Sequence, residues 1–348
     1  MELLNVRDYE AEAERRLDPG AYGYYAGGAG DEVTLRENVA AYGRWRLRPR
    51  VLVDVGACTT GTTVLGHEIA FPLLVAPVAF QRVAHPEGEL AMARAARAAG
   101  TILCLSTMTT TPPADVAAVG SQRWFQLYVF RDAAVTRELV AQARECGFTA
   151  LLLTVDTPVL GRRERDHRTG FTLPDGVTVA SLGRGGMTPA ETFALTSPSV
   201  TWRDVELLAA ESSLPVLVKG VLTAEDARLA CEHGAAGIVV SNHGGRQLDG
   251  VAATIEALPE VIEAVEGRVE VLVDGGIRRG ADVVKALALG ARAVLAGRAP
   301  LWGLAVGGEE GARAVLELLR DEILLALQLL GCPSPAAVTR AHVEPARR

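Results

Sequence analysis

The chain has 348 residues, of which 49% are hydrophobic and 22% are charged, and its formal net charge is −7 at pH 7. This composition provides a sizeable core and argues against wholesale disorder. A negative net charge without a basic, aromatic-rich tract argues against a nucleic-acid partner. No apolar run approaches the ~20 residues that span a bilayer, so we expect no membrane partner.

The cysteines indicate a reducing compartment. They are scattered along the chain, with no CxxC pair and no histidine at ligand spacing: Cys58, Cys104, Cys146, Cys231 and Cys332. This pattern predicts neither a metal site nor a disulfide framework. The first residues, MELLNVRDYEAEAERRL, lack the apolar core of a signal peptide. We therefore expect a cytoplasmic protein without a metal.

In chain order, residues 1–70 are predicted to form a helical N-terminal segment, and residues 71–330 a barrel. Short apolar runs typical of buried strands occur at 73–76, 102–105, 124–127, 151–154, 216–218, 238–240, 271–273 and 293–296. Helical patterns, several ending at glycine, lie at 88–100, 133–147, 223–234 and 280–290. Eight strands alternating with helices predict an α/β fold, a (β/α)8 TIM barrel in one domain spanning 1–348. The alternative, a doubly wound sheet, usually carries a GxGxxG first turn, which is absent here.

The regular spacing is interrupted once, after the fourth strand. About sixty residues separate Thr154 from Val216; they hold an arginine-rich patch at 161–168, a Pro/Gly/Thr-rich stretch at 174–198 and a helix starting near Trp202. An insertion of this size on a barrel's functional face is typical of a lid. We expect residues 161–201 to form an active-site loop.

The predicted strand ends carry polar residues or glycine, and in a barrel the carboxyl ends of all strands face one mouth. These positions are Val78-Ala79, Ser106, Gln126, Tyr128, Thr154, Asp156, Lys219, Ser241, His243, Asp274-Gly275-Gly276 and Gly297-Arg298. After the seventh and eighth strands, glycine amides with Arg278 and Arg298 predict a phosphate site. Considered singly, Lys219 could be a structural residue in a salt bridge, and Asp156 could cap a helix. Together the positions favour an enzyme.

The decapeptide SNHGGRQLDG, residues 241–250, gives the strongest functional signal. His243 suits proton abstraction because imidazole titrates near neutrality, and the guanidinium of Arg246 can bind a carboxylate through two hydrogen bonds. A lone His-Gly-Gly turn is more often structural. The matching residues at the other strand ends reverse that preference.

Five segments now identify a resemblance: 124–129, 153–166, 217–230, SNHGGRQLDG and 273–291. They resemble the FMN-dependent 2-hydroxy-acid oxidases and dehydrogenases, which include glycolate oxidases, lactate oxidases and mandelate dehydrogenases. The resemblance runs from Asn5 to about His342. It implies FMN as cofactor and oxidation of an (S)-2-hydroxy acid to the 2-oxo acid.

The resemblance also implies roles for the candidate residues. His243 would remove the hydroxyl proton as hydride passes to flavin N5, with Asp156 orienting it and Tyr128 binding the hydroxyl. The substrate carboxylate would be bound by Tyr24, Arg163 and Arg246. Lys219 would lie beside the reduced flavin's negative charge. The other residues expected to bind FMN are Pro77, Val78, Ala79, Ser106, Gln126, Thr154, Ser241, Asp274, Gly275, Gly276, Ile277, Arg278, Gly297 and Arg298.

Departures from the family pattern suggest a substrate and an acceptor. Met108 stands where the glycolate oxidases carry tryptophan, and Phe80 adds an aromatic wall, so both are expected to bind an aryl or medium-chain substituent. The pocket motifs are most similar to those of the 4-hydroxymandelate oxidases. Ala79 is similar to members that use O2 and produce H2O2. The resemblance also implies a homo-oligomer, a tetramer or octamer.

Several alternatives stay open on the sequence. One is a soluble dehydrogenase of the same substrates with another electron acceptor, and another is a small-substrate glycolate or lactate oxidase. A barrel isomerase or lyase using Lys219 would keep the phosphate site but leave Tyr24, Arg163 and Arg246 without a role. A catalytically idle flavin-binding protein is disfavoured by the presence of His243.

Overall fold

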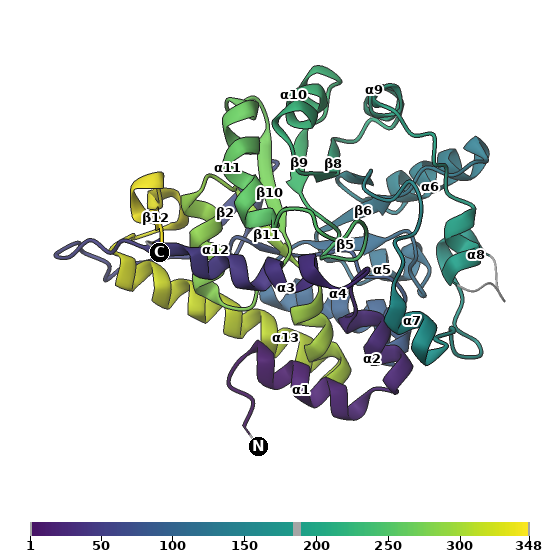
Figure 1. The fold of residues 1–348 in the computed structure, drawn as a ribbon, viewed down its shortest axis with the longest axis horizontal. Coiled ribbons are helices and arrows are strands. Elements are labelled where there is room, and N and C mark those ends of the chain that lie inside the picture. Colours follow the sequence, from purple (N-terminus) through teal and green to yellow (C-terminus); the bar gives the residue numbers. More distant parts are fainter. Residues whose placement is uncertain (1, 184–188, 347–348) are drawn as a thin grey trace.

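The computed structural model describes residues 2–183 and 189–346, and the positions 184–188 of the predicted lid lie outside these residues. Eight parallel strands close into a barrel in the order β10-β11-β4-β5-β6-β7-β8-β9 (Figure 1). The predicted (β/α)8 barrel is confirmed. The barrel strands are β4 (Leu73–Val75), β5 (Leu103–Ser106), β6 (Arg123–Leu127), β7 (Leu151–Thr154), β8 (Val216–Val221), β9 (Gly237–Val240), β10 (Glu270–Asp274) and β11 (Ala293–Ala296).

Helices surround this barrel, and the four predicted ones occur where the periodicity places them. Helix α4 ends at Gly100, whose φ of 74° gives the left-handed C-cap that glycine adopts without strain. Helix α11 is an additional helix that the sequence does not predict, because it contains Pro259, and proline is unfavourable inside a helix. The helices between the barrel strands are α4 (Gly88–Ala99), α5 (Pro113–Ala118), α6 (Ala133–Glu145), α10 (Ala224–Glu232), α11 (Thr254–Val265) and α12 (Gly280–Ala288).

The insertion after β7 contains several helical segments, of which α9 packs against β8 and α10. Thr201 caps α9 by a reciprocal arrangement with Asp204, and that helix starts where the sequence predicts it. The segments of the insertion are α7 (Glu164–Thr169), η3 (Ala180–Leu182), α8 (Pro189–Ala194) and α9 (Trp202–Glu211).

The N-terminal segment is helical only as far as residue 44 and differs from the prediction beyond it. Its helices are α1 (Val6–Arg16), α2 (Pro19–Ala26), α3 (Val33–Ala40) and η1 (Ala41–Arg44). The three strands that follow are β1 (Trp45–Leu47), β2 (Thr62–Val64) and β3 (His67–Ile69). Strands β2 and β3 form a hairpin because Leu65 and Gly66 both have positive φ, as a two-residue turn requires. The β-branched residues of β2 also favour a strand.

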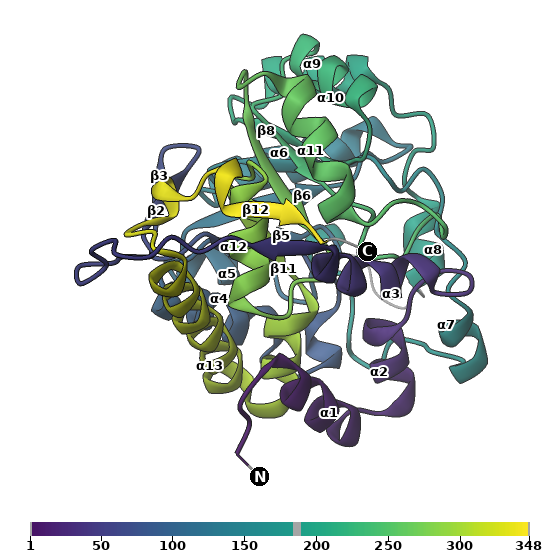
Figure 2. The same cartoon turned by 60° about the vertical axis from the view of Figure 1, so that its left-hand side comes forward.

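Two segments that are far apart in the sequence lie side by side. Strand β1 pairs antiparallel with β12 (Val343–Pro345), as Figure 2 illustrates. Helix α13 (Arg298–Leu330) is interrupted at Gly307 and Gly308 and packs along α1 and α4. The short helices η4 (Pro335–Ala337) and η5 (Arg340–His342) connect it to β12. No helix in the described part of the chain is both long and apolar enough to cross a membrane.

The core has an inner and an outer layer. Side chains inside the barrel, such as Leu74, Trp124 and Leu152, form one buried cluster, and Val64 and Ile69 of the β2–β3 hairpin pack into it. The larger cluster lies between the strands and the surrounding helices. The barrel interior is thus filled with side chains, which leaves its carboxyl end for a site.

Candidate active site

A cavity opens at the carboxyl end of the barrel. It brings together residues from the ends of all eight strands with residues of α2, the insertion and the start of α13. Its lining consists of Tyr24, Tyr25, Ala76, Pro77, Val78, Ala79, Ser106, Gln126, Tyr128, Thr154, Arg163, Phe193, Lys219, His243, Gly244, Arg246, Asp274, Gly275, Gly276, Ile277, Arg278, Leu295, Ala296, Gly297, Arg298, Ala299 and Leu301.

His243 reaches this cavity through an unusual backbone conformation. It follows β9 and adopts the left-handed region with φ 59°, as do Gly244 and Gly245 after it. A histidine in this region is uncommon, and such a conformation is kept where surrounding contacts hold it. One such contact is the hydroxyl of Ser241, which lies 3.1 Å from the His243 amide nitrogen and accepts its hydrogen bond.

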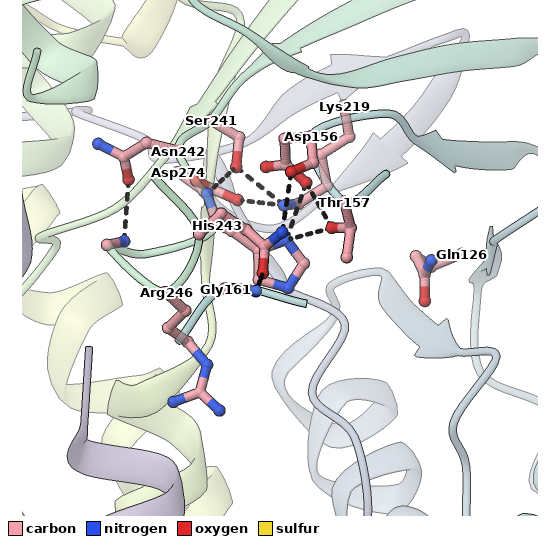
Figure 3. Close-up of polar contacts among 12 residues, drawn as sticks. Gln126, Asp156, Thr157, Gly161, Lys219, Ser241, Asn242, His243, Arg246 and Asp274 are labelled. Carbon is pink, nitrogen blue, oxygen red and sulfur yellow. Dashed lines mark hydrogen bonds and ion pairs between the residues drawn. The ribbon is translucent and has the colours of Figure 1, made fainter. Parts of the chain in front are cut away.

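A buried carboxylate orients the imidazole. Nδ1 of His243 lies 2.9 Å from Oδ1 of Asp156, and the hydroxyl of Thr157 lies 2.9 Å from the same oxygen (Figure 3). Burial lowers the pKa of His243 despite this carboxylate. Burial raises the pKa of Asp156, but His243, Lys219 and Thr157 outweigh it and hold that pKa below its usual value. The pair is therefore a neutral imidazole beside an ionised carboxylate, with Nε2 left to act as a base.

Lys219, on β8, is a buried cation held by two partners. Its Nζ lies 3.1 Å from Oδ2 of Asp274 and 2.8 Å from the Ser241 hydroxyl (Figure 3). Burial lowers the pKa of Lys219, but Asp274 and Asp156 outweigh it and raise that pKa above its usual value. The ammonium therefore stays charged, and it places a fixed positive charge beside the cavity.

Three arginines give the cavity an excess of positive charge. Arg163, Arg246 and Arg298 form no salt bridge within residues 2–183 and 189–346. Arg246 donates to the carbonyl oxygens of Tyr24 and Gly27 at 2.6 and 2.9 Å, and Arg298 also donates to carbonyls. Burial and the neighbouring Arg246 lower the pKa of Arg163 to about 10, and burial lowers that of Arg298 to about 9. Such a site favours anionic ligands, because an anion would offset the buried charges.

Two tyrosines complete the polar face of the cavity. Burial raises the pKa of Tyr24 and of Tyr128, so both phenols keep their protons and can donate hydrogen bonds. The Tyr24 ring stacks on Phe171 at 4.6 Å between centroids and lies under the guanidinium of Arg246. These contacts hold the Tyr24 phenol in the cavity wall.

Three buried polar atoms of the cavity wall mark where a cofactor would bind. Within the described residues, Nε2 of Gln126, Oγ1 of Thr154 and Oδ1 of Asp274 have no hydrogen-bond partner. Buried polar groups are rarely left unpaired, so this donor and acceptor set fits a polar ring and its hydroxylated chain. A Cβ at Gly276 would lie 1.8 Å from the carbonyl oxygen of Asn38, which explains glycine beside the predicted phosphate site. These residues fit the expected FMN.

Four predicted residues lie outside the cavity lining. Asp156 and Ser241 lie behind it and act on it through His243 and Lys219. Phe80 and Met108 are both 0% exposed and are absent from the lining, so their contact with a substrate stays a prediction. Phe80 instead touches the ring of Tyr24, at 5.9 Å between centroids.

The sequence reasoning missed several lining residues. Phe193 of α8 packs edge-on against Tyr128 at 5.3 Å, which brings the insertion into the cavity wall. Tyr25 follows Tyr24 directly, and its hydroxyl donates to the carbonyl of Phe80 at 2.6 Å. The apolar periodicity of these short segments gave no signal, because their burial depends on the assembled cavity.

Comparisons with known proteins agree with this geometry. The FMN-dependent dehydrogenase family matches residues 13–345. Glycolate oxidase 3 of Arabidopsis thaliana is 51% identical over 355 residues, which cover 99% of the chain and 96% of the relative. L-lactate oxidase of Nostoc sp. is 51% identical over 345 residues, 94% of each protein.

Solved structures give the same result. A mutant mandelate oxidase with (S)-mandelic acid has a TM-score of 0.94 and 46% identity and is covered completely by the chain. Mandelate oxidase with benzoyl-formic acid has a TM-score of 0.93 and 45% identity, over 99% of each chain. The family predicted from the motifs is thereby confirmed, and its cofactor is FMN. The chain belongs to the FMN-dependent dehydrogenase family.

Proposed function

We propose that the protein is an FMN-dependent oxidase that converts an (S)-2-hydroxy acid and O2 to the 2-oxo acid and H2O2. One observation carries this proposal: a neutral His243, oriented by Asp156, lines the same cavity as Arg163 and Arg246. A base and two guanidiniums that form no salt bridge with a described residue are what a hydroxyl beside a carboxylate requires. The glycolate, lactate and mandelate oxidases among its relatives support the same chemistry.

Each residue of the site would have a separate role in this reaction. Arg163 and Arg246, with the phenol of Tyr24, would bind the substrate carboxylate, and Tyr128 would donate to the hydroxyl oxygen. Nε2 of His243 would take the hydroxyl proton, and Asp156 would stabilise the resulting imidazolium. FMN, when bound, supplies the hydride acceptor. Lys219 would stabilise the negative charge that FMN carries when it is reduced.

We further propose an aryl or medium-chain substituent on the α-carbon. Phe193 supports this, because it places an aromatic side chain in the cavity wall beside Tyr128. The mandelate oxidase structures, similar over the entire chain, support it as well. Met108 and Phe80 would then shape the pocket from behind its lining.

A barrel lyase with Lys219 as a Schiff-base residue is disfavoured. Such a lysine must lose its proton to act as a nucleophile, and the ion pair with Asp274 raises the pKa of Lys219. A dehydrogenase with another acceptor would share every substrate contact. Ala79, which lines the cavity, supports the choice of O2 because it resembles the oxidases at this position.

We also propose a cytoplasmic homo-oligomer, a tetramer or octamer. All five cysteines are free, which is typical of a reducing compartment. Leu325 and Leu329 of α13 are 55% and 70% exposed, as residues of a subunit contact would be in a single chain. Light scattering of the purified protein tests the oligomer, and a monomer would contradict it.

The activity itself is tested with purified protein in air. Peroxide and 2-oxo acid are measured with glycolate, lactate, 2-hydroxyoctanoate and (S)-mandelate. We expect peroxide with all substrates that are turned over and the highest kcat/KM with (S)-mandelate. Flavin reduction without peroxide would favour a dehydrogenase, and a colourless protein would contradict the proposal.

A further inference from the structure

Glu89 is a buried carboxylate that lies outside the candidate active site. It is 0% exposed, occupies the first turn of α4 and forms no salt bridge with any described residue. Burial of an unpaired charge is costly unless hydrogen bonds and local dipoles compensate. The position near a helix N-terminus supplies part of that compensation.

Four donors from two loops supply the rest. Oε1 of Glu89 accepts from the backbone amides of Gln81 and Thr110 at 3.1 and 2.9 Å. Oε2 accepts from the hydroxyls of Thr110 and Thr111 at 2.6 and 2.9 Å. Gln81 begins the short helix η2 (Gln81–Val83) within the loop after β4, and the two threonines belong to the loop after β5. One carboxylate therefore ties together the loops that follow two neighbouring strands.

The bond to Gln81 stabilises a strained turn. Phe80, the preceding residue, has φ 59°, a left-handed conformation that a bulky residue rarely adopts. Its amide donates to the carbonyl of Met108 at 3.0 Å, and its own carbonyl accepts from Tyr25. Ala79, next to Phe80, lines the cavity. Glu89 is thus connected to the cavity wall through Gln81, which lies two residues after Ala79.

The second loop reaches the cavity by a similar route. The hydroxyl of Thr110 accepts from the amide of Arg82, a further link between the loops. The hydroxyl of Ser106 accepts from the amide of Met108, lines the cavity and lies 3.2 Å from Oε1 of Gln126. Ala79 and Ser106, which line the cavity after the neighbouring strands β4 and β5, are therefore both connected to the carboxylate behind them.

We propose that Glu89 is a positioning residue that holds the ends of β4 and β5 at the separation that FMN requires. This inference rests on the proposed function only in taking the cavity as the FMN site. Arg163, Arg246 and His243 reach the cavity from other elements, so their geometry is independent of Glu89. Loss of the carboxylate should weaken cofactor binding while leaving carboxylate recognition intact.

The test uses the full-length holoenzyme and two substitutions of Glu89. Glu89→Met removes the acceptor for all four donors, and the dissociation constant of FMN should rise by about tenfold or more, with a changed flavin absorption band. Glu89→Gln keeps one oxygen for the two amides, and its NH2 group can donate to the hydroxyls. It should restore most of the affinity.

Two controls separate positioning from overall stability. Glu87→Met makes the same substitution at an exposed glutamate that pairs with Arg94, and it should leave FMN affinity unchanged. Thr111→Val removes one donor to Oε2 and should weaken FMN binding, while Thr111→Ser should restore it. This pair decides the question if Glu89→Met does not fold.

A lower Tm for Glu89→Met together with wild-type FMN affinity and spectrum would overturn the inference, because a merely structural role predicts that result. Equal FMN affinity in Thr111→Val and wild type would overturn it as well. A wild-type protein that binds FMN but oxidises no 2-hydroxy acid would contradict the proposed function alone. The two proposals therefore fail in different experiments.

Discussion

Nδ1 of His243 is fixed by Oδ1 of Asp156 at 2.9 Å, and the two residues lie 87 positions apart on the loops after β9 and β7. A carboxylate at this nitrogen keeps the proton on Nδ1 and leaves the lone pair of Nε2 for the substrate. Both side chains are largely but not completely buried, which strengthens this contact relative to one in open solvent.

Replacement of His243 should remove the base without removing the cofactor. His243→Asn should stay yellow, because FMN contacts come from other residues. Anaerobic flavin reduction by substrate should slow by about 10²–10⁴-fold or more. Stopped-flow absorbance measures this rate, and near-normal reduction would place the base elsewhere.

The pH dependence should follow the lowered pKa of His243. Only the neutral imidazole accepts a proton, and burial makes the charged form less favourable. We therefore expect kcat/KM to be constant down to about pH 6.5, the ordinary value for histidine, and to decrease only below it.

Asp156→Asn provides the comparison. The carboxylate raises the pKa of His243, so its loss should move the acidic limb to lower pH while reducing the plateau. An acidic limb above pH 7 in the wild type would contradict the assignment of a buried neutral base.

Of the two arginines proposed to bind the substrate carboxylate, Arg163 has fewer other contacts and is the better one to replace. Its Nε makes one long hydrogen bond, 3.4 Å, to the carbonyl of Arg246, whereas Arg246 also holds the backbone of α2. Arg163→Lys keeps the charge but loses the planar two-point contact, so KM should rise and kcat should fall. FMN content should not change.

Methyl esters of the same hydroxy acids serve as the control for this assignment. An ester lacks the anionic oxygen that the guanidinium binds, so wild type should discriminate strongly against it, and Arg163→Lys should lose part of that discrimination. Equal turnover of ester and acid by wild type would contradict the assignment.

Two substitutions should each lower the preference for a large substrate, one by removing an apolar contact and the other by filling space. Burial of a phenyl group contributes about 25 cal/mol per Å², so (S)-mandelate should exceed glycolate in kcat/KM by about tenfold or more. Phe193→Ala should lower kcat/KM for (S)-mandelate more than for glycolate, because Phe193 lines the cavity. Met108→Trp should shift preference toward small acids by adding volume behind the lining. Preference of the wild type for glycolate would refute the aryl pocket.

The sequence predicted all eight barrel strands because each combines a short branched apolar run with a polar or glycine end. It predicted the polar site for the same reason, since a barrel places its strand ends together. Residues 45–69 were different: their strands depend on the Leu65-Gly66 turn and on pairing of β1 with β12 near the other end of the chain. Long-range pairing of this kind leaves little local signal.

The sequence indicated which residues gather near the site better than it indicated which of their side chains face the cavity. Met108 and Phe80 are both 0% exposed and do not line the cavity, so their expected contact with a substrate stays a prediction. The Phe80 amide donates to the Met108 carbonyl, and the Glu89 carboxylate accepts from the amide of Gln81. Phe193 enters the cavity wall from a short helix of the insertion. Only the assembled loops determine which of these side chains faces the cavity.

The most direct test of the oxidase assignment is a stoichiometric measurement in an oxygen electrode. With purified holoenzyme and limiting (S)-mandelate, the O2 consumed, the H2O2 formed and the 2-oxo acid formed should be equal in amount. 2-Oxo acid formed only when an artificial electron acceptor is added, with no uptake of O2, would contradict the account.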